Sequence, residues 1–228
     1  MTSLDIEPIH DMRLRHDSSF LIAGPSYSGK TVLVQKMIKY KNEIFDIPPA
    51  EIYWCYGQYQ MALFDQLREQ GVHLMEGVPE NLETLIRPYS FLVIDDLMSE
   101  VANSHHVTNI FTRITHHMHV TCVFLTQNLF QKGPEARTRS LNSSYLILMK
   151  NPRDMSQIRH LATQMFPNNV RYLINVYNDA VKKPFSYLLI DLRQETPDSL
   201  RLRSQIFPSD DKYTIYTQSN GSNSPKKK

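Results

Sequence analysis

Short apolar runs alternate with segments of helical spacing along most of the chain, and this alternation predicts an α/β fold. The apolar runs have the length and composition of strands and cover residues 19–23, 51–56, 91–96, 120–126 and 145–149, with a short extra run at 72–75. Helical spacing follows at 31–40, 61–70, 82–86, 107–118, 155–165 and 169–181. Strands that alternate with helices in this way form a central, mostly parallel sheet flanked by helices.

The two ends of the chain carry weaker patterns. Residues 1–17 are polar without a sustained period, which predicts an extended lead-in. Residues 185–191 and 200–202 alternate on either side of a Pro-Asp turn, which predicts a C-terminal β-hairpin. The last ten residues, 219–228, are polar and end in three lysines, so we expect a disordered tail; nuclear targeting or a phosphate contact is the alternative for the lysines. We therefore place one domain at 18–208 and a tail at 209–228.

Composition narrows the class of protein. The chain has 228 residues, 41% of them hydrophobic, and a net charge of +2, which excludes an overall disordered chain and a strongly basic nucleic-acid binder. Any contact with DNA must come from local patches. No apolar run has the length of a membrane span, so we expect an intracellular protein without a membrane partner. Cys55 and Cys122 lie inside strand-like runs, where we expect buried free thiols.

Eight residues between the first predicted strand and the first predicted helix fit the phosphate-loop pattern G-x-x-x-x-G-K-[ST] in full: Gly24, Pro25, Ser26, Tyr27, Ser28, Gly29, Lys30 and Thr31. The two glycines let the backbone turn tightly, so that N–H groups and the following helix N-terminus face the phosphates of a nucleotide. Lys30 then reaches the β and γ phosphates, and the Thr31 hydroxyl holds Mg²⁺. The pattern permits a bulky Tyr27 without requiring it, and we assign its ring no chemical role.

A second signal lies at residues 91–96, where four apolar residues are followed by Asp95 and Asp96. A buried parallel strand that ends in carboxylates is typical of a Walker B element. Asp95 is then expected to hold Mg²⁺ through water, and Asp96 to polarise the attacking water as a general base. Taken alone, the run is equally well explained as a strand end or a helix cap. Its pairing with a complete phosphate loop favours the Walker B interpretation.

The order of the strands adds a third signal. One strand separates the loop strand from the Walker B strand, and the strand that follows Walker B ends in Gln127. This order predicts a P-loop ATPase with an additional catalytic acid, in which the strand after Walker B lies next to the loop strand. Gln127 is then expected to act as a sensor of the γ-phosphate. The alternative is that its amide caps the next turn.

Five segments together resemble one protein family: residues 24–31, 91–96, 123–130, 137–142 and 150–154. They are similar to the genome-packaging ATPases of polinton-type and related large DNA viruses, within the FtsK-HerA group of DNA translocases. The resemblance covers about residues 20–208 and implies ATP and Mg²⁺ as cofactors, a homo-oligomeric ring, and double-stranded DNA as the substrate. It also implies Gln127 as the sensor and Arg137 as a finger that acts on the neighbouring subunit's nucleotide.

Several alternatives stay open at this point. Arg139 or Arg153 is the other candidate for the finger, and Arg137 is otherwise a solvated loop residue or a DNA-phosphate contact. The resemblance implies an ATP-driven translocase that packages a viral genome, with a capsid or portal component as partner. Such a protein works in the host nucleus or cytoplasm and is associated with the virion during packaging. One rival function is an ATP-dependent helicase or remodeller of nucleic acid. Another is a nucleotide-binding DNA-recognition or assembly protein with little turnover.

Overall fold

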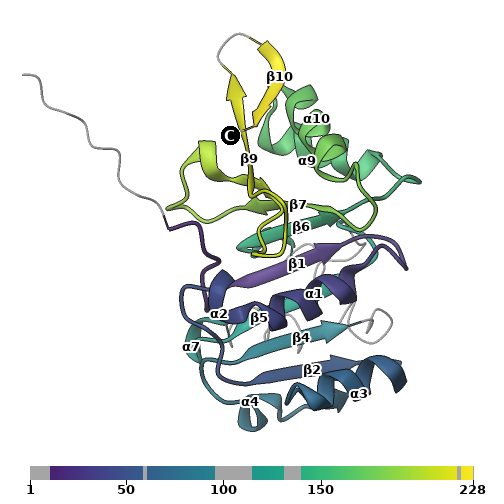
Figure 1. Ribbon diagram of the computed structural model, residues 1–228, viewed down its shortest axis with the longest axis vertical. Coiled ribbons are helices and arrows are strands. Elements are labelled where there is room, and N and C mark those ends of the chain that lie inside the picture. Colours follow the sequence, from purple (N-terminus) through teal and green to yellow (C-terminus); the bar gives the residue numbers. More distant parts are fainter. Residues whose placement is uncertain (1–10, 59–60, 96–114, 131–139, 220–221, 228) are drawn as a thin grey trace, which may run out of the picture.

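The computed structural model describes residues 11–58, 61–95, 115–130, 140–219 and 222–227, and these build one mixed sheet covered by helices (Figure 1). Part of the sheet is parallel, and its strands all point to the same side of the molecule. The parallel strands, from the outer edge inward, are β3 (His73–Glu76), β2 (Ile52–Tyr56), β4 (Phe91–Asp95), β5 (Thr121–Thr126), β1 (Ser19–Ala23) and β6 (Tyr145–Met149). The predicted strands are therefore confirmed, including the short extra one.

The position of β5 between β1 and β4 confirms the strand order predicted from the sequence. Ala23 at the end of β1 is level with Thr126 at the end of β5. On the other side of β5, Phe124 is level with Ile94 of β4. Three neighbouring strands thus end at the same edge of the sheet, and the loops that follow them lie close together.

Beyond β6 the sheet continues with antiparallel strands: β7 (Tyr187–Asp191), β8 (Leu202–Ser204), β9 (Thr214–Ser219) and β10 (Ser222–Lys227). The β7–β8 pair confirms the predicted hairpin. Strands β9 and β10 were not predicted from the sequence. We expected residues 219–228 to be a disordered tail, whereas Ser222–Lys227 pairs with β9, where Lys226 lies opposite Thr217. Backbone hydrogen bonds define this pairing, so a pattern of apolar residues does not reveal it.

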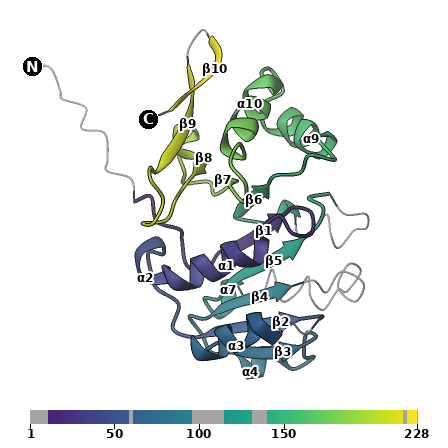
Figure 2. The same ribbon diagram turned by 45° about the vertical axis from the view of Figure 1, so that its right-hand side comes forward.

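Helices cover both faces of the sheet (Figure 2). They are α1 (Lys30–Lys39), α2 (Lys41–Ile44), α3 (Met61–Glu69), α4 (Leu82–Leu85), α7 (Thr115–His117), α9 (Ser156–Met165) and α10 (Val170–Ala180), together with a 3₁₀ turn η2 (Asp198–Leu200). Of the predicted helix at 107–118, only the end falls within the described residues, as α7. None of the helices in the described ranges is long and apolar enough to cross a membrane.

The two faces have separate cores because successive strand residues point to opposite sides. In β1, Phe20 and Ile22 pack on the face covered by α1 and α3. Leu21 and Ala23 pack on the other face, which is covered by α4, α9 and α10. Ser19–Ala23 is buried throughout, as expected for a central parallel strand. This places the loop after β1 at the end of a rigid element.

Both cysteines are buried free thiols, as the sequence predicted. Cys55 lies in β2 and Cys122 in β5, and both belong to the core beneath α4, α9 and α10. Burial raises the pKa of the Cys55 thiol to about 12. Both thiols therefore act as small apolar side chains of the core.

Candidate nucleotide-binding site

The phosphate loop, Asp95 and Gln127 lie at one edge of the sheet, after the ends of three adjacent strands. The loop follows β1, Asp95 is the last residue of β4, and Gln127 follows β5, which lies between them. The N–H of Gly24 donates to the carbonyl of Thr126 at 3.1 Å, which ties the start of the loop to the end of β5. This is the carboxyl edge of the parallel strands, where α/β proteins bind their ligands.

The two glycines of the loop are needed for different reasons. A Cβ at Gly24 would lie 2.6 Å from Met149 Cβ and 2.7 Å from Ser28 Oγ, so no side chain fits there. Gly29 has φ 98°, in the left-handed region that favours glycine, directly before α1. The sequence suggested tight turning for both residues. Only Gly29 uses that freedom, whereas Gly24 allows the loop to approach β6 closely.

The N-terminus of α1 is suited to an anion. No side chain in the described part of the chain caps it, and its first turn contains no acidic residue. The first N–H groups of a helix lack partners within the helix and carry a partial positive charge. Lys30 lies beside them, and its Nζ donates to the carbonyls of Gly24 at 2.6 Å and Pro25 at 3.0 Å. A phosphate group at this place would meet N–H donors and an ammonium group together.

Ser28 and Tyr27 face different surroundings inside the loop. Ser28 Oγ is buried and has no hydrogen-bond partner within the part of the chain that the structure describes. Such a hydroxyl is costly to leave without a partner, and a phosphate oxygen would accept its hydrogen bond. Tyr27 has φ 63° and is 99% exposed. Its ring therefore makes little contact with the rest of the protein.

Thr31 and Asp95 fit a magnesium ion by their chemistry. Thr31 is half-buried in the first turn of α1, and Asp95 is buried at the end of β4. A hydroxyl and a carboxylate are oxygen donors, the kind of ligand that Mg²⁺ takes together with phosphate oxygens and water. Asp96, the candidate base, directly follows Asp95 in the sequence but lies outside the described residues, as do Arg137 and Arg139.

Gln127 is exposed at the end of β5. The turn that follows is closed by Thr126, whose Oγ1 donates to the carbonyl of Asn128 at 2.9 Å and accepts from the N–H of the same residue at 3.3 Å. Thr126 thus performs the capping that was the alternative role for Gln127. Arg153, the described candidate among the three arginines, is exposed on the loop after β6.

Sequence reasoning missed Gln157, which holds the segment after Gln127 in place. Its Oε1 accepts from the N–H of Leu129 at 2.7 Å, and its Nε2 donates to Asn128 Oδ1 at 3.3 Å and Asp154 Oδ2 at 2.7 Å. A glutamine near the start of a helix carries no motif of its own. The nearest signal was the segment at 150–154, which belongs to the family resemblance.

Comparison with known proteins agrees with this geometry. No family model and no curated protein matches the sequence. Among solved structures, the DNA-packaging ATPase from Sulfolobus turreted icosahedral virus is similar with a TM-score of 0.55 at 11% identity, over 80% of this chain and 96% of that one. The chain has the fold of a P-loop NTPase. The genome-packaging NTPase from Sulfolobus turreted icosahedral virus 2 in complex with AMP is similar with a TM-score of 0.50 at 12% identity, over 82% and 96%. The same NTPase in complex with ATP-gammaS gives the same values.

Proposed function

We propose that this chain is an ATPase that drives double-stranded DNA into a viral capsid. The observation that carries the proposal is the shared sheet edge, which brings the phosphate loop, Asp95 and Gln127 to the ends of β1, β4 and β5. These are the groups that ATP hydrolysis needs: a cradle for phosphates, a ligand for the metal and a polar group for the γ-phosphate.

Each residue then has a defined task. The loop N–H groups and Lys30 bind the β and γ phosphates and stabilise the negative charge that spreads over them during hydrolysis. Thr31 and Asp95 would hold Mg²⁺, which supplies further neutralisation of that charge. Asp96 takes the proton of the attacking water, and Gln127 orients the γ-phosphate or the water.

The packaging activity is supported from two directions. The similar solved structures are named as packaging ATPases or NTPases, and the match covers nearly the whole of each. Independently, five segments of the sequence resemble the FtsK-HerA translocases of large DNA viruses. On this basis the working form is a homo-oligomeric ring around double-stranded DNA, docked on a capsid or portal component inside the host cell.

The central test measures ATP turnover and movement on DNA with the full chain. We expect double-stranded DNA to stimulate turnover, and the protein to displace a triplex-forming third strand in an ATP-dependent way. DNA affinity should fall steeply with salt and depend little on sequence, because a moving protein grips phosphates. Separation of duplex strands would favour the helicase alternative. Salt-insensitive binding to one short sequence with negligible turnover would favour the recognition-protein alternative.

Arg137 is proposed to act across a subunit interface on the γ-phosphate of the neighbour. Arg137→Ala should then lower turnover by about a thousandfold with little change in ATP affinity. The decisive measurement mixes Arg137→Ala subunits, which retain Asp96, with Asp96→Asn subunits, which retain the arginine. Activity should return in mixed rings, since some interfaces then join an intact base to an intact finger. Mixed rings that stay inactive would remove Arg137 from this role and direct the same test to Arg139 and Arg153.

A further inference from the structure

A cavity of about 330 Å³ opens beside the phosphate loop. One wall comes from the start of α1, where Gly29, Val32 and Lys36 lie. The other wall comes from the segment that leads into β7, with Phe185, and from the segment that follows β8, with Gln205 and Asp210. The two walls come from well-separated parts of the sequence. They meet because α1 packs on the face of the sheet where β1 is followed by β6 and β7.

The sheet order places this cavity on the side of the loop away from Asp95. Asp95 and Gln127 follow β4 and β5, whereas the cavity is lined by residues at the start of β7 and the end of β8, beyond β6. A nucleoside triphosphate on the loop must direct its γ-phosphate toward Asp95 and Gln127 for hydrolysis. Its α-phosphate and nucleoside then extend in the opposite direction, toward β6 and β7.

Two apolar side chains of the cavity lining are largely exposed. Phe185 is 68% exposed and Val32 is 63% exposed. Phe185 also has φ 60°, a strained value for a residue with a bulky side chain. Its ring lies close to Gly29, since a Cβ added to that glycine would lie 3.1 Å from Phe185 Cδ1. Strained residues gather at ligand clamps. Here the strained residue places its aromatic ring against the last glycine of the phosphate loop.

The charges of the lining favour an uncharged group over a further phosphate. Lys36 is paired with Asp210, and Lys183 lies 3.6 Å from Asp211. These four residues are the charged members of the lining, and their charges cancel. Gln205, which also has a positive φ of 56°, adds an amide that carries both a donor and an acceptor. A flat, uncharged ring with donors and acceptors on its edge suits this combination.

We infer that this cavity binds the base of the nucleotide, with a purine stacked on the ring of Phe185 beside Val32. The inference rests on the proposed function, because it takes the phosphates to lie on the loop. Stacking between a base and an aromatic side chain contributes on the order of tenfold or more to affinity. It adds to the site a contact that inorganic phosphates lack.

The test compares two ligands, ATP and inorganic tripolyphosphate, each with Mg²⁺, by calorimetric titration of the full chain. Phe185→Ala should weaken ATP binding on the order of tenfold and leave tripolyphosphate binding unchanged. Phe185→Tyr should bind ATP like the parent, and Phe185→Leu, which keeps apolar bulk without a flat ring, should fall between. Tyr89→Ala is the matched control, since Tyr89 is also aromatic, 45% exposed and held at φ 59°, but lies before β4 at the opposite edge of the sheet.

The outcomes separate this inference from the proposed function. If Lys30→Ala loses both ligands while Phe185→Ala binds ATP like the parent, the loop is a nucleotide site and the inference is overturned. Equal weakening of both ligands in Phe185→Ala and Phe185→Leu would also overturn it, because the ring would then act by supporting the loop. If the parent binds neither ligand, or Lys30→Ala binds both like the parent, the proposed function fails and the inference fails with it.

Discussion

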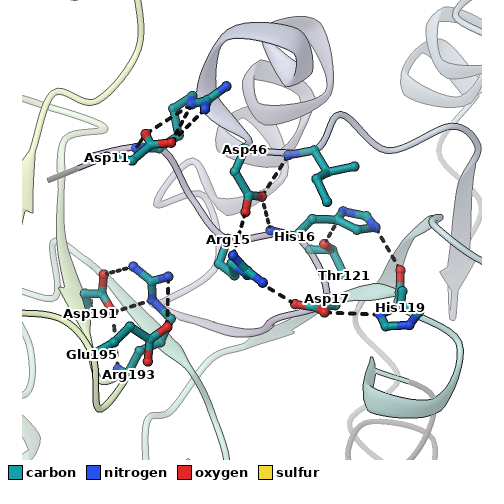
Figure 3. Close-up of polar contacts among 12 residues, drawn as sticks. Asp11, Arg15, His16, Asp17, Asp46, His119, Thr121, Asp191, Arg193 and Glu195 are labelled. Atoms are coloured by element: carbon teal, nitrogen blue, oxygen red, sulfur yellow. Dashed lines mark hydrogen bonds and ion pairs between the residues drawn. The ribbon is translucent and has the colours of Figure 1, made fainter.

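Polar side chains are hydrogen-bonded and ion-paired differently at the two edges of the parallel sheet. At the amino edge, where β5 and β6 begin, polar groups bond to one another (Figure 3). His16 is buried there, with Nε2 donating to the carbonyl of His119 at 2.8 Å and Nδ1 accepting from the Thr121 hydroxyl at 2.9 Å. Arg15 forms an ion pair with Asp46, with 3.3 Å between Arg15 Nη1 and Asp46 Oδ2. Asp191, at the end of β7, is buried between Arg193 and Arg203.

At the carboxyl edge the polar groups lie around the phosphate loop instead. Lys30 bonds to backbone carbonyls of its own loop, the α1 N-terminus has no side-chain cap, and Ser28 Oγ has no partner among the described residues. The amino edge has exceptions of its own, Arg203 Nε and Thr196 Oγ1, next to a cavity of about 130 Å³ with room for water. Ion pairing therefore stabilises the amino edge, whereas the carboxyl edge presents donors that an anion would satisfy.

The largest expected effect is a loss of ATP turnover from a substitution at the carboxyl edge. Lys30→Ala should lower ATP turnover by about a thousandfold or more, because the charge on the β and γ phosphates loses its main neutralising side chain. Its free energy of unfolding without nucleotide should stay close to that of the parent. Lys39→Ala, an exposed lysine on the same helix, serves as the control in a steady-state ATPase assay. Normal turnover in Lys30→Ala would show that the loop is not the active site.

The next effect is a loss of folding stability from a substitution at the amino edge. Asp191→Asn should lower the free energy of unfolding by about 3–5 kcal/mol, because it leaves the buried guanidinium of Arg203 without its counter-charge and leaves Arg193 paired with the exposed Glu195 alone among the described residues. Urea denaturation monitored by circular dichroism measures it. Asp198→Asn removes an exposed partner of Arg201 and should change stability by less than about 1 kcal/mol. Equal stability of the two variants would mean that the amino edge does not depend on ion pairing.

The smallest effect is a pH dependence at the amino edge. Burial lowers the pKa of His16 below its usual value, with the hydrogen bond to His119 opposing the shift. Below about pH 6.5 the unfolded chain takes up a proton that folded His16 resists, so stability falls as the pH drops from there through the folded pKa. Thermal unfolding at pH 7.5 and 5.5 should show this loss, and His16→Asn should reduce it. An unchanged pH dependence in His16→Asn would assign the loss to other groups.

The sequence predicted the carboxyl edge better than the amino edge, for physical reasons. A phosphate loop needs given residue types at fixed spacing, so Gly24 to Thr31 can be recognised from the sequence. The strand that ends in Asp95 can be recognised in the same way, from a short apolar run followed by carboxylates. His16 bonds to His119 and Thr121, which lie more than 100 residues further along the chain, and Asp191 meets Arg203 through the pairing of β7 with β8, so no local pattern encodes these contacts. The same limit applies to Gln157, Phe185 and β9–β10, whose positions depend on the packed sheet. The roles of Asp96 and Arg137 stay predictions, since both residues lie outside the described ranges.

The connection between β6 and β7 has a mechanical consequence. It begins beside Gln127, where Gln157 of α9 holds Asn128 and Leu129, and it ends at Phe185 against Gly29. Between these contacts, Tyr177 of α10 fixes the end of β6 by accepting from the N–H of Asn151 at 2.9 Å and donating to the carbonyl of Met149 at 3.0 Å. The connection therefore spans the candidate site from the segment after Gln127 to Gly29, so a displacement at one of these places reaches the other through α9 and α10.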